Sequence, residues 1–198
     1  MKILAFSDLH SSKSRLKDLL KKIISSNPDI LISAGDTSNF GSNLKEIISE
    51  IKKTKKILLI IPGNHETCEE IRKISDGITV IDLHKRIYKI EDVIFIGYGT
   101  GGFSKKEPEF EEISKRFGRA IENTSKIILI THGPPYGTKT DLIHDLGHMG
   151  CISYTNFIKK HKPMLHICGH LHETWHIEDI LGNTRIINPG PDGKILKI

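Results

Sequence analysis

The first part of the chain alternates between short apolar runs and segments in which apolar residues recur every three or four positions. Residues 3–7 form such a run, and segment 14–25 carries leucine and isoleucine at helical spacing. The alternation continues, which predicts strands at 29–33 and 57–61 and helices at 43–52 and 69–75. Strands that alternate with helices in this way are typical of a largely parallel, buried sheet.

The pattern changes near residue 79, where apolar runs follow one another with no room for helices between them. The remaining sequence predicts strands at 80–83, 86–90, 93–98, 126–131 and 163–168, helices at 108–121 and 153–161, and a closing meander at 174–180, 184–188 and 194–198. Two sheets packed face to face, with helices outside, fit this order best. We find no internal repeat or linker, and therefore expect a single domain over residues 1–198.

Composition narrows the class of protein. A chain of 198 residues buries about seventy per cent of its unfolded surface, so it needs no disulfides for stability. The cysteines at 68, 151 and 168 form no paired motif, and we see neither a signal peptide nor an apolar run long enough to span a membrane. We therefore expect a cytoplasmic protein. Its formal net charge of +5 favours an anionic ligand, but the charge is spread along the chain and argues against nucleic acid as a partner.

Five of the predicted strands end in aspartate, asparagine or histidine, usually beside glycine. The segments are Asp8-Leu9-His10, Gly35-Asp36, Gly63-Asn64-His65-Glu66, Thr131-His132-Gly133 and Gly169-His170-Leu171-His172. Because carboxyl ends of parallel strands form the binding edge of open α/β sheets, these side chains should converge. In extended backbone, residues two apart point to the same side, so Asp8 and His10 could reach one ion together, as could His170 and His172.

The residue types also restrict the metal. Neutral imidazole with carboxylate and amide oxygen suits manganese, iron, cobalt, nickel or zinc. No cysteine belongs to the five segments, which argues against a structural zinc site. The adjacent glycines allow tight turns and a close approach of the backbone to the ions.

In this order, the five segments resemble the motif set of the calcineurin-like metallophosphoesterases, in particular their small single-domain prokaryotic branch. The resemblance runs from Asp8 to the turn at 188–190. It implies an α/β fold: a four-layer α/β/β/α sandwich of two mixed sheets flanked by helices, the metallo-dependent phosphatase fold.

The resemblance also implies two divalent transition-metal ions and their ligands. One ion is expected on Asp8, His10 and His172, and the other on Asn64, His132 and His170, with Asp36 bridging both. Manganese is the first expectation, with iron, nickel, cobalt or zinc as alternatives. By the same resemblance, His65 binds no metal and faces the leaving oxygen.

These residues predict a metal-dependent phosphoesterase acting on a small phosphate ester: a phosphodiester such as a cyclic nucleotide, or a phosphomonoester. Two ions about 3.5–4 Å apart can share a hydroxide that attacks phosphorus in line. His65 and Asp36 are the expected catalytic residues, since an imidazolium at His65 could protonate or stabilise the leaving oxygen. We expect Asp36 or another acidic neighbour to orient His65.

Two other functions compete with this one. The first is a nuclease like the DNA-repair branch of the family. We expect no DNA-capping domain after the last motif, which argues against a nuclease. The second is a protein-binding scaffold that has lost catalysis. The presence of His65 with all seven ligand positions argues against a scaffold.

The long loop at 134–151 follows His132 and is too long for a plain connector. Its opening residues resemble the same small prokaryotic branch. We expect Tyr136, Asp141 and His148 to line the substrate pocket, with hydrogen bonding inside the loop as the alternative.

Overall fold

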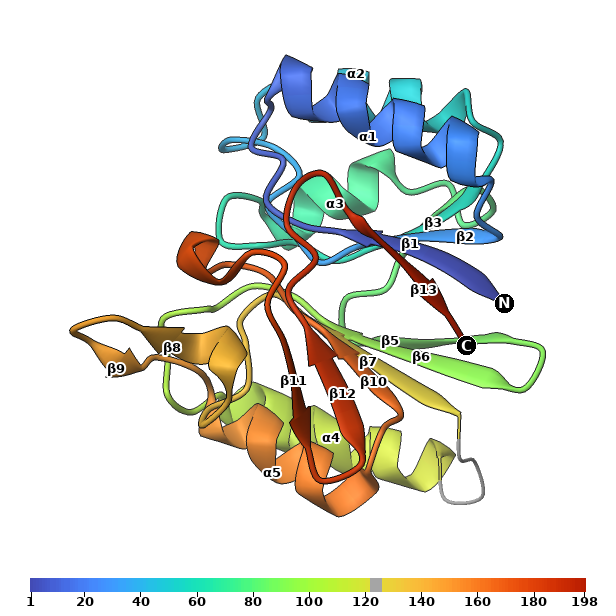
Figure 1. The fold of residues 1–198 in the computed structure, drawn as a ribbon. Helices are drawn as coiled ribbons and strands as arrows, with labels where there is room; N and C mark the ends of the chain where they lie inside the picture. Colours follow the sequence, from blue (N-terminus) through green and yellow to red (C-terminus); the bar gives the residue numbers. More distant parts are fainter. Residues whose placement is uncertain (122–125) are drawn as a thin grey trace.

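Two sheets lie face to face in the computed structural model, which describes residues 1–121 and 126–198 (Figure 1). Helices α1–α3 cover the outer face of one sheet, and helices α4 and α5 cover the outer face of the other. The layers therefore follow the order helix, sheet, sheet, helix. This arrangement confirms the predicted four-layer sandwich of mixed sheets.

The first sheet has the strand order β13-β1-β2-β3-β4. Its members are β1 (Lys2–Phe6), β2 (Ile30–Ser33), β3 (Ile57–Ile60), β4 (Val80–Asp82) and β13 (Lys194–Lys197). Strands β1 to β4 are parallel, and β13 pairs antiparallel with β1. The crossovers between the parallel strands contain α1 (Lys13–Ser26), α2 (Leu44–Lys52) and α3 (Cys68–Ile74).

The second sheet has the order β11-β12-β10-β7-β6-β5. Its members are β5 (Arg86–Ile90), β6 (Val93–Tyr98), β7 (Ile127–Thr131), β10 (Leu165–Ile167), β11 (Glu178–Leu181) and β12 (Thr184–Ile187). The four inner strands are parallel, and the edge strands β5 and β11 are antiparallel to their neighbours. Helices α4 (Pro108–Ala120) and α5 (Ile152–His161) connect strands of this sheet.

The predicted closing meander is wrong in two respects. Strands β11 and β12 form a hairpin in the second sheet, but β13 crosses to the first sheet and pairs with β1. Residues His172–Thr174 form a short 3-10 helix, so β11 begins only at Glu178. An apolar pattern indicates which face of a strand is buried, but it does not specify the neighbouring strand.

Both faces of the central strands are buried. Along β1, Ile3 and Ala5 pack into the core between the sheets, whereas Leu4 and Phe6 pack beneath the helices of the first sheet. Strands buried on both faces read as continuous apolar runs rather than as alternating ones. The runs therefore end where the backbone leaves the core, and polar residues begin there.

The helices begin at ordinary caps. The side chain of Ser12 accepts a hydrogen bond from the backbone of Arg15 at the start of α1, and Thr67 forms a capping box with Glu70 at the start of α3. Across residues 1–121 and 126–198, none of the helices combines the length and apolarity needed to cross a lipid bilayer.

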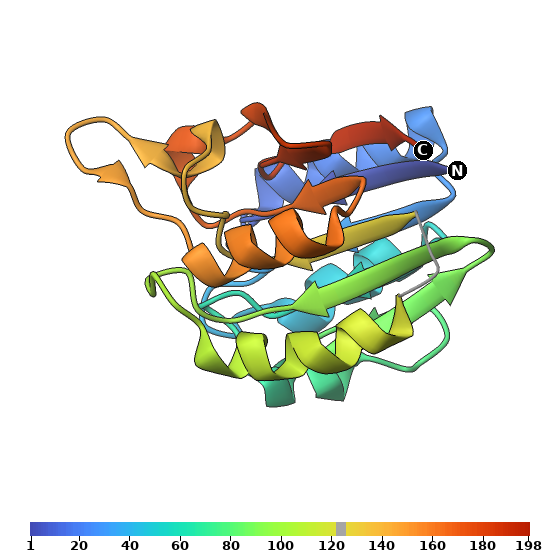
Figure 2. The ribbon, with the colours of Figure 1, turned by 90° about the horizontal axis from the view of Figure 1, so that it is seen from below.

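The long loop after β7 contains structure that the sequence did not predict. A 3-10 helix at Lys139–Asp141 leads into a small hairpin of β8 (Leu142–Ile143) and β9 (Gly147–His148). Figure 2 shows this hairpin projecting from the body of the sandwich.

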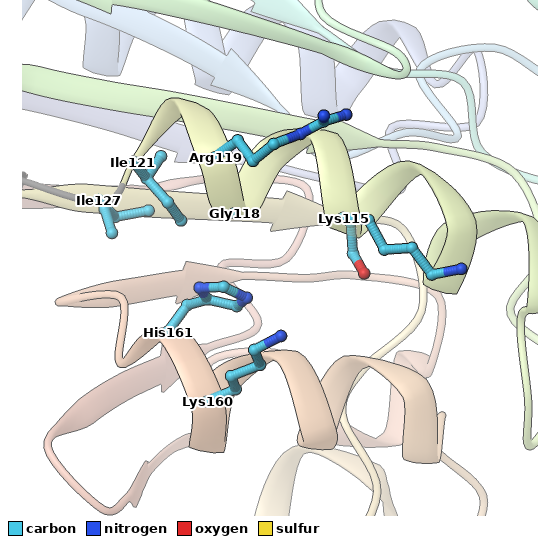
Figure 3. A pocket seen from close by; sticks show the side chains of 8 residues that line it. Lys115, Gly118, Arg119, Ile121, Ile127, Lys160 and His161 are labelled. Carbon is cyan, nitrogen blue, oxygen red and sulfur yellow. The ribbon is translucent and has the colours of Figure 1, made fainter.

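A depression of about 500 Å³ lies between α4, α5 and β7 (Figure 3). Its basic side chains include Lys115 and Arg119 of α4 and Lys160 and His161 of α5. Arg119, Lys160 and His161 lie in the last turns of their helices, where positive charge complements the helix dipole. That role accounts for them without a ligand, and the five polar motifs contribute no residue to this depression.

Candidate metal centre

The five polar motifs meet at one edge of the sandwich, where β1, β2, β3, β7 and β10 end. The first sheet supplies Asp8, His10, Asp36, Asn64 and His65, and the second supplies His132, His170 and His172. Each of these residues lies within five positions of the end of its strand. The parallel topology of both sheets therefore brings them together.

Donor atoms of these side chains face one another at short range. His10 Nε2 lies 3.1 Å from His172 Nε2, and Asn64 Oδ1 lies 2.9 Å from both His132 Nε2 and His170 Nδ1. With metal–nitrogen bonds of about 2.1 Å, two ligands at right angles on one ion lie about 3 Å apart. The donors therefore have the spacing of atoms that share an ion.

Asp36 lies between the two groups of donors. Its Oδ2 is 3.7 Å from His10 Nε2 and 3.4 Å from His132 Nε2. Three trios could each hold an ion: Asp8, His10 and His172; His10, Asp36 and His65; Asp8, Asp36 and His132. Asp36 is thus the side chain best placed to reach both halves of the centre.

Two further observations are expected for a site that binds metal ions rather than for a closed network of hydrogen bonds. Asp8 Oδ2 is buried and finds no hydrogen-bond partner among the residues that the structure describes. His132 Nδ1 lies 2.9 Å from the carbonyl oxygen of Ala34, which can only accept, so Nδ1 carries the proton and Nε2 faces the centre. A buried carboxylate oxygen without a partner is costly, and a cation would remove that cost.

The backbone at the centre differs from the expected extended geometry. Asp8, His10, Asp36 and His170 all have positive φ, at 57°, 48°, 51° and 72°. A left-handed residue other than glycine costs about 1–2 kcal/mol, and such strain clusters at functional sites. Asp8 and His10 do converge, but through left-handed turns rather than through the alternation of a strand.

Glu66 holds one of these left-handed positions, Asp36, in place. Its buried carboxylate accepts hydrogen bonds from the backbone N–H groups of Asp36 (3.0 Å), Ser38 (2.5 Å) and Gly63 (3.0 Å), and from Ser38 Oγ (2.9 Å). Burial raises the pKa of Glu66, although the hydrogen bonds from Ser38 and Gly63 oppose that rise. The sequence motif contained Glu66, but the spacing alone did not indicate its role as a link between the loops after β2 and β3.

Gly63 allows the loops after β2 and β3 to approach each other closely enough for these hydrogen bonds. A Cβ atom at this position would lie 2.0 Å from Asp36 Oδ1 and 2.5 Å from the backbone nitrogen of Asp36. Only glycine therefore lets the loop after β3 approach Asp36 this closely.

His65 is oriented by an amide rather than by the expected acidic neighbour. Its Nδ1 lies 2.8 Å from Asn39 Oδ1, and its backbone N–H donates to Asp36 Oδ1 at 2.9 Å. Asn39 lies in the Gly/Ser/Asn loop after β2, which carries no motif that would identify it from sequence.

His172 is supported by an aromatic stack that the sequence did not indicate. The ring of Trp175 lies 4.7 Å from that of His172 at an angle of 35°, and the guanidinium of Arg15 lies 4.7 Å from the Trp175 ring. Trp175 is the only tryptophan in the chain and lies just after the last motif, which is the one signal that could have identified it.

The charges of the centre are strongly coupled in the metal-free protein. Burial alone would lower the pKa of His132, but its hydrogen bond and charge interaction with Asp36 raise it to about 9. Burial alone would raise the pKa of Asp36. The hydrogen bond and charge of His132, with the hydrogen bond from the backbone N–H of His65, instead lower it to about 2. Burial lowers the pKa of His10 and, with the charge of His132, lowers that of His170 to about 4. Neutral His10 and His170 are in the form that binds metal.

The loop residues predicted to contact substrate bond mainly to one another. Asp141 is buried and accepts hydrogen bonds from the N–H groups of Thr138 and Gly150, and its Oδ1 lies 2.8 Å from His148 Nδ1. The Tyr136 ring lies 5.4 Å from the His148 ring. These contacts describe the alternative of hydrogen bonding inside the loop, and contact with a substrate stays a prediction.

A depression of about 300 Å³ opens beside the donors. Its lining comprises His10, Asp36, Asn64, His65, Phe103, Ile143, His170, Leu171, His172 and Glu173. Within the described part of the chain, Tyr136, Asp141 and His148 do not line it.

Comparisons with known proteins agree with this geometry. The family profile of the calcineurin-like phosphoesterases matches residues 1–174. The uncharacterized protein MJ1162 of Methanocaldococcus jannaschii is 31% identical over 202 residues, which cover 96% of this chain and 88% of that protein.

Solved structures with low sequence identity share the fold. The structure of TT1561 from Thermus thermophilus superposes with a TM-score of 0.75 at 14% identity, covering 96% of this chain and 88% of that one. A dimetal phosphatase from Danio rerio gives a TM-score of 0.68 at 10% identity, covering 94% and 86% of the two chains.

The Glu66 link generates a first prediction. Glu66→Gln should lower the free energy of unfolding by at least about 2 kcal/mol, because an amide NH₂ would face backbone donors that then lose their acceptor. It should also weaken metal binding by about 10- to 100-fold, as loss of a supporting contact does. Urea unfolding and titration with Mn²⁺ measure the two effects. The same substitution at exposed Glu91 is the matched control, and equal behaviour of the two variants would contradict this role for Glu66.

The pH dependence of the metal-free protein gives a second prediction. Because folding raises the pKa of His132 to about 9 from 6.5, its contribution to stability is complete below pH 6.5 and is lost as the pH rises through 9. His84, His166 and His170 have folded pKa values lowered to about 4, 3 and 4, so they destabilise the fold as the pH falls below 6.5. The Tm of the chelator-treated protein should therefore decline on both sides of neutrality.

Added Mn²⁺ should oppose the alkaline decline, because it binds the neutral form of His132. Thermal unfolding from pH 5 to pH 9.5, with chelator or with Mn²⁺, measures both curves. A metal-free Tm that rises steadily between pH 7 and pH 9 would show that His132 does not hold the extra proton.

Proposed function

The chain belongs to the calcineurin-like phosphoesterase family, and we propose that it hydrolyses a small phosphodiester with the help of two divalent metal ions. The observation that carries this proposal is the approach of His10 Nε2 to His172 Nε2 at 3.1 Å. Two ring nitrogens at this distance need either a shared proton or a shared ion. The remaining donors nearby, and the unpartnered oxygen of Asp8 among the described residues, favour the ion.

The proposed ligand sets are those expected from the family. Asp8, His10 and His172 would hold one ion, and Asn64, His132 and His170 would hold the other, with Asp36 placed to reach both. Manganese is the proposed metal, with iron, nickel, cobalt or zinc as alternatives, because imidazole, amide and carboxylate donors suit this group. When bound, two such ions supply a nucleophile near neutral pH and neutralise the charge of the phosphate.

His65 is the proposed proton donor to the leaving oxygen. Asn39 Oδ1 accepts a hydrogen bond from the Nδ1–H group of His65, so Nε2 is the ring nitrogen that can transfer a proton. The backbone N–H of His65 donates a hydrogen bond to Asp36 Oδ1, which ties the backbone of His65 to the proposed ligand that reaches both ions. Asp36 thus has a positioning role as well as a ligand role.

The single-domain assignment and the cytoplasmic location remain predictions of the sequence.

The charge of the depression favours a diester over a monoester. Among the described residues, no lysine or arginine lines it, whereas Glu173 does. A monoester carries about two negative charges near neutral pH and a diester carries one. Glu173 therefore opposes a monoester more strongly, and neither lysine nor arginine is present in the described lining to offset its charge.

A third prediction tests the reaction itself. With Mn²⁺, the protein should hydrolyse bis-p-nitrophenyl phosphate, and His65→Ala should lower kcat by about 100-fold or more, since general acid catalysis contributes that much. Metal content, measured by elemental analysis, should be the same in both proteins. Full activity in the variant, or none in a metal-loaded wild type, would refute the assigned chemistry. Prior removal of the metal with a chelator should abolish activity, and Mn²⁺ should restore it.

A fourth prediction concerns Glu173. Glu173→Gln should raise kcat/KM for p-nitrophenyl phosphate about twofold more than for bis-p-nitrophenyl phosphate, because the exposed charge is partly screened by salt. The difference should shrink as ionic strength rises. Glu91→Gln, at an exposed position in the β5–β6 turn, is the control for loss of a surface charge. An equal change for both substrates would mean that Glu173 does not select between them.

A further inference from the structure

A buried histidine lies beside the end of β7, next to the residue that precedes the proposed ligand His132. His166 of β10 is fully buried, and so is its neighbour Thr131, the last residue of β7. Leu165 and Ile167 pack between the sheets, so the side chain of His166 lies on the opposite face, which α4 and α5 cover (Figure 1). His166 therefore reaches the metal centre only through its neighbours.

The hydrogen bonds that start at His166 have a fixed direction. Thr131 Oγ1 donates to the carbonyl oxygen of Gly133 at 2.6 Å, because a carbonyl can only accept. The hydroxyl has a single hydrogen, so it accepts from His166 Nε2, which lies 2.7 Å away. Burial lowers the pKa of His166 to about 3, so the ring is neutral and its one proton is on Nε2.

This arrangement leaves the other ring nitrogen of His166 unsatisfied. Nδ1 is buried and has no hydrogen-bond partner among the residues that the structure describes. A buried acceptor without a partner destabilises a fold, and a leucine of similar bulk would avoid that cost. Burial alone therefore does not explain the histidine. The hydrogen bond that Nε2 donates is the feature that leucine would lack.

The two hydrogen bonds enclose His132. Thr131 precedes this residue and Gly133 follows it, so the bond between them closes the backbone around His132. The N–H of Gly169 donates to the carbonyl oxygen of His132 at 2.8 Å, which fixes the same turn against the last motif. With Thr131 Oγ1 accepting from His166, its hydrogen stays directed at Gly133.

We propose that His166 is a positioning residue for the metal centre, which acts through Thr131 to fix the backbone on both sides of His132. The inference rests on the proposed function, because it requires His132 to bind an ion together with Asn64 and His170. His166 itself touches neither metal nor substrate. Its loss should weaken the ion on His132 and leave the ion on the other half of the centre unchanged.

Substitutions of His166 separate positioning from packing. His166→Leu removes both the donor and the unpartnered Nδ1, so the Tm of the metal-free protein should stay equal or rise. The affinity for one of two Mn²⁺ ions should nevertheless fall about 10- to 100-fold, as loss of a supporting contact does. His166→Gln, whose amide nitrogen can take the place of Nε2, should restore most of that affinity. A histidine needed only for packing would show the reverse, a lower Tm with unchanged affinity.

Thr131→Val tests the same connection from its other end. Valine keeps the shape of threonine without the hydroxyl, and the variant should weaken the same ion by a similar factor. Adding His166→Leu to Thr131→Val should weaken Mn²⁺ binding no further, because the connection is already broken. Ile186→Val is the packing control, since buried Ile186 lies opposite His166 on β12. It should lower the Tm and leave the affinity for both ions unchanged.

Calorimetric titration of the chelator-treated proteins with Mn²⁺ measures both affinities without turnover. The predicted loss in His166→Leu, restored by His166→Gln, supports the inference even if bis-p-nitrophenyl phosphate is not hydrolysed. Unchanged affinities in His166→Leu, equal weakening of both ions, or a loss that Ile186→Val reproduces or His166→Gln does not restore, overturn the inference alone. Wild type that binds fewer than two Mn²⁺ ions would refute the proposed function and this inference with it.

Discussion

The Glu66 carboxylate is the contact on which the rest of the candidate centre depends. It joins the loops after β2 and β3 by accepting N–H groups from both, at the point where each backbone leaves the core. Without this acceptor, several buried donors would compete for water, and the left-handed turn at Asp36 would lose its support. A charged group that never faces the depression therefore determines where the donors lie.

The centre also depends on contacts between the sheets. The N–H of His170, from the second sheet, donates to Asp8 Oδ1 of the first at 3.1 Å, and His132 bonds to the carbonyl of Ala34. The core between the sheets fixes their separation through residues such as Phe95, Ile128 and Ile32. The spacing of the donors is thus also a consequence of side-chain packing between the sheets.

Much of this could be predicted from the sequence, because apolar runs and the residues that end them are local signals. Strands β5 and β6 begin and end where the pattern indicated, and the order of the polar motifs indicated the family. Contacts between distant segments were not predictable. Three examples are the pairing of β13 with β1, the contact of the Asn39 amide with His65, and the stack of Trp175 on His172. Each joins segments whose proximity is set by the tertiary fold, and the spacing of residues along the chain does not indicate it.

The pairing of β13 with β1 has a consequence for the order of assembly. Residues 2–5 lie opposite residues 194–197, so one side of β1 stays an unpaired edge until residues 194–197 have been synthesised. An apolar strand with an open edge is a template for wrong pairing, and contacts of such long range form slowly. The nascent chain therefore carries the segment of Asp8 and His10 next to an open strand edge, and exposed edges of this kind favour aggregation during folding.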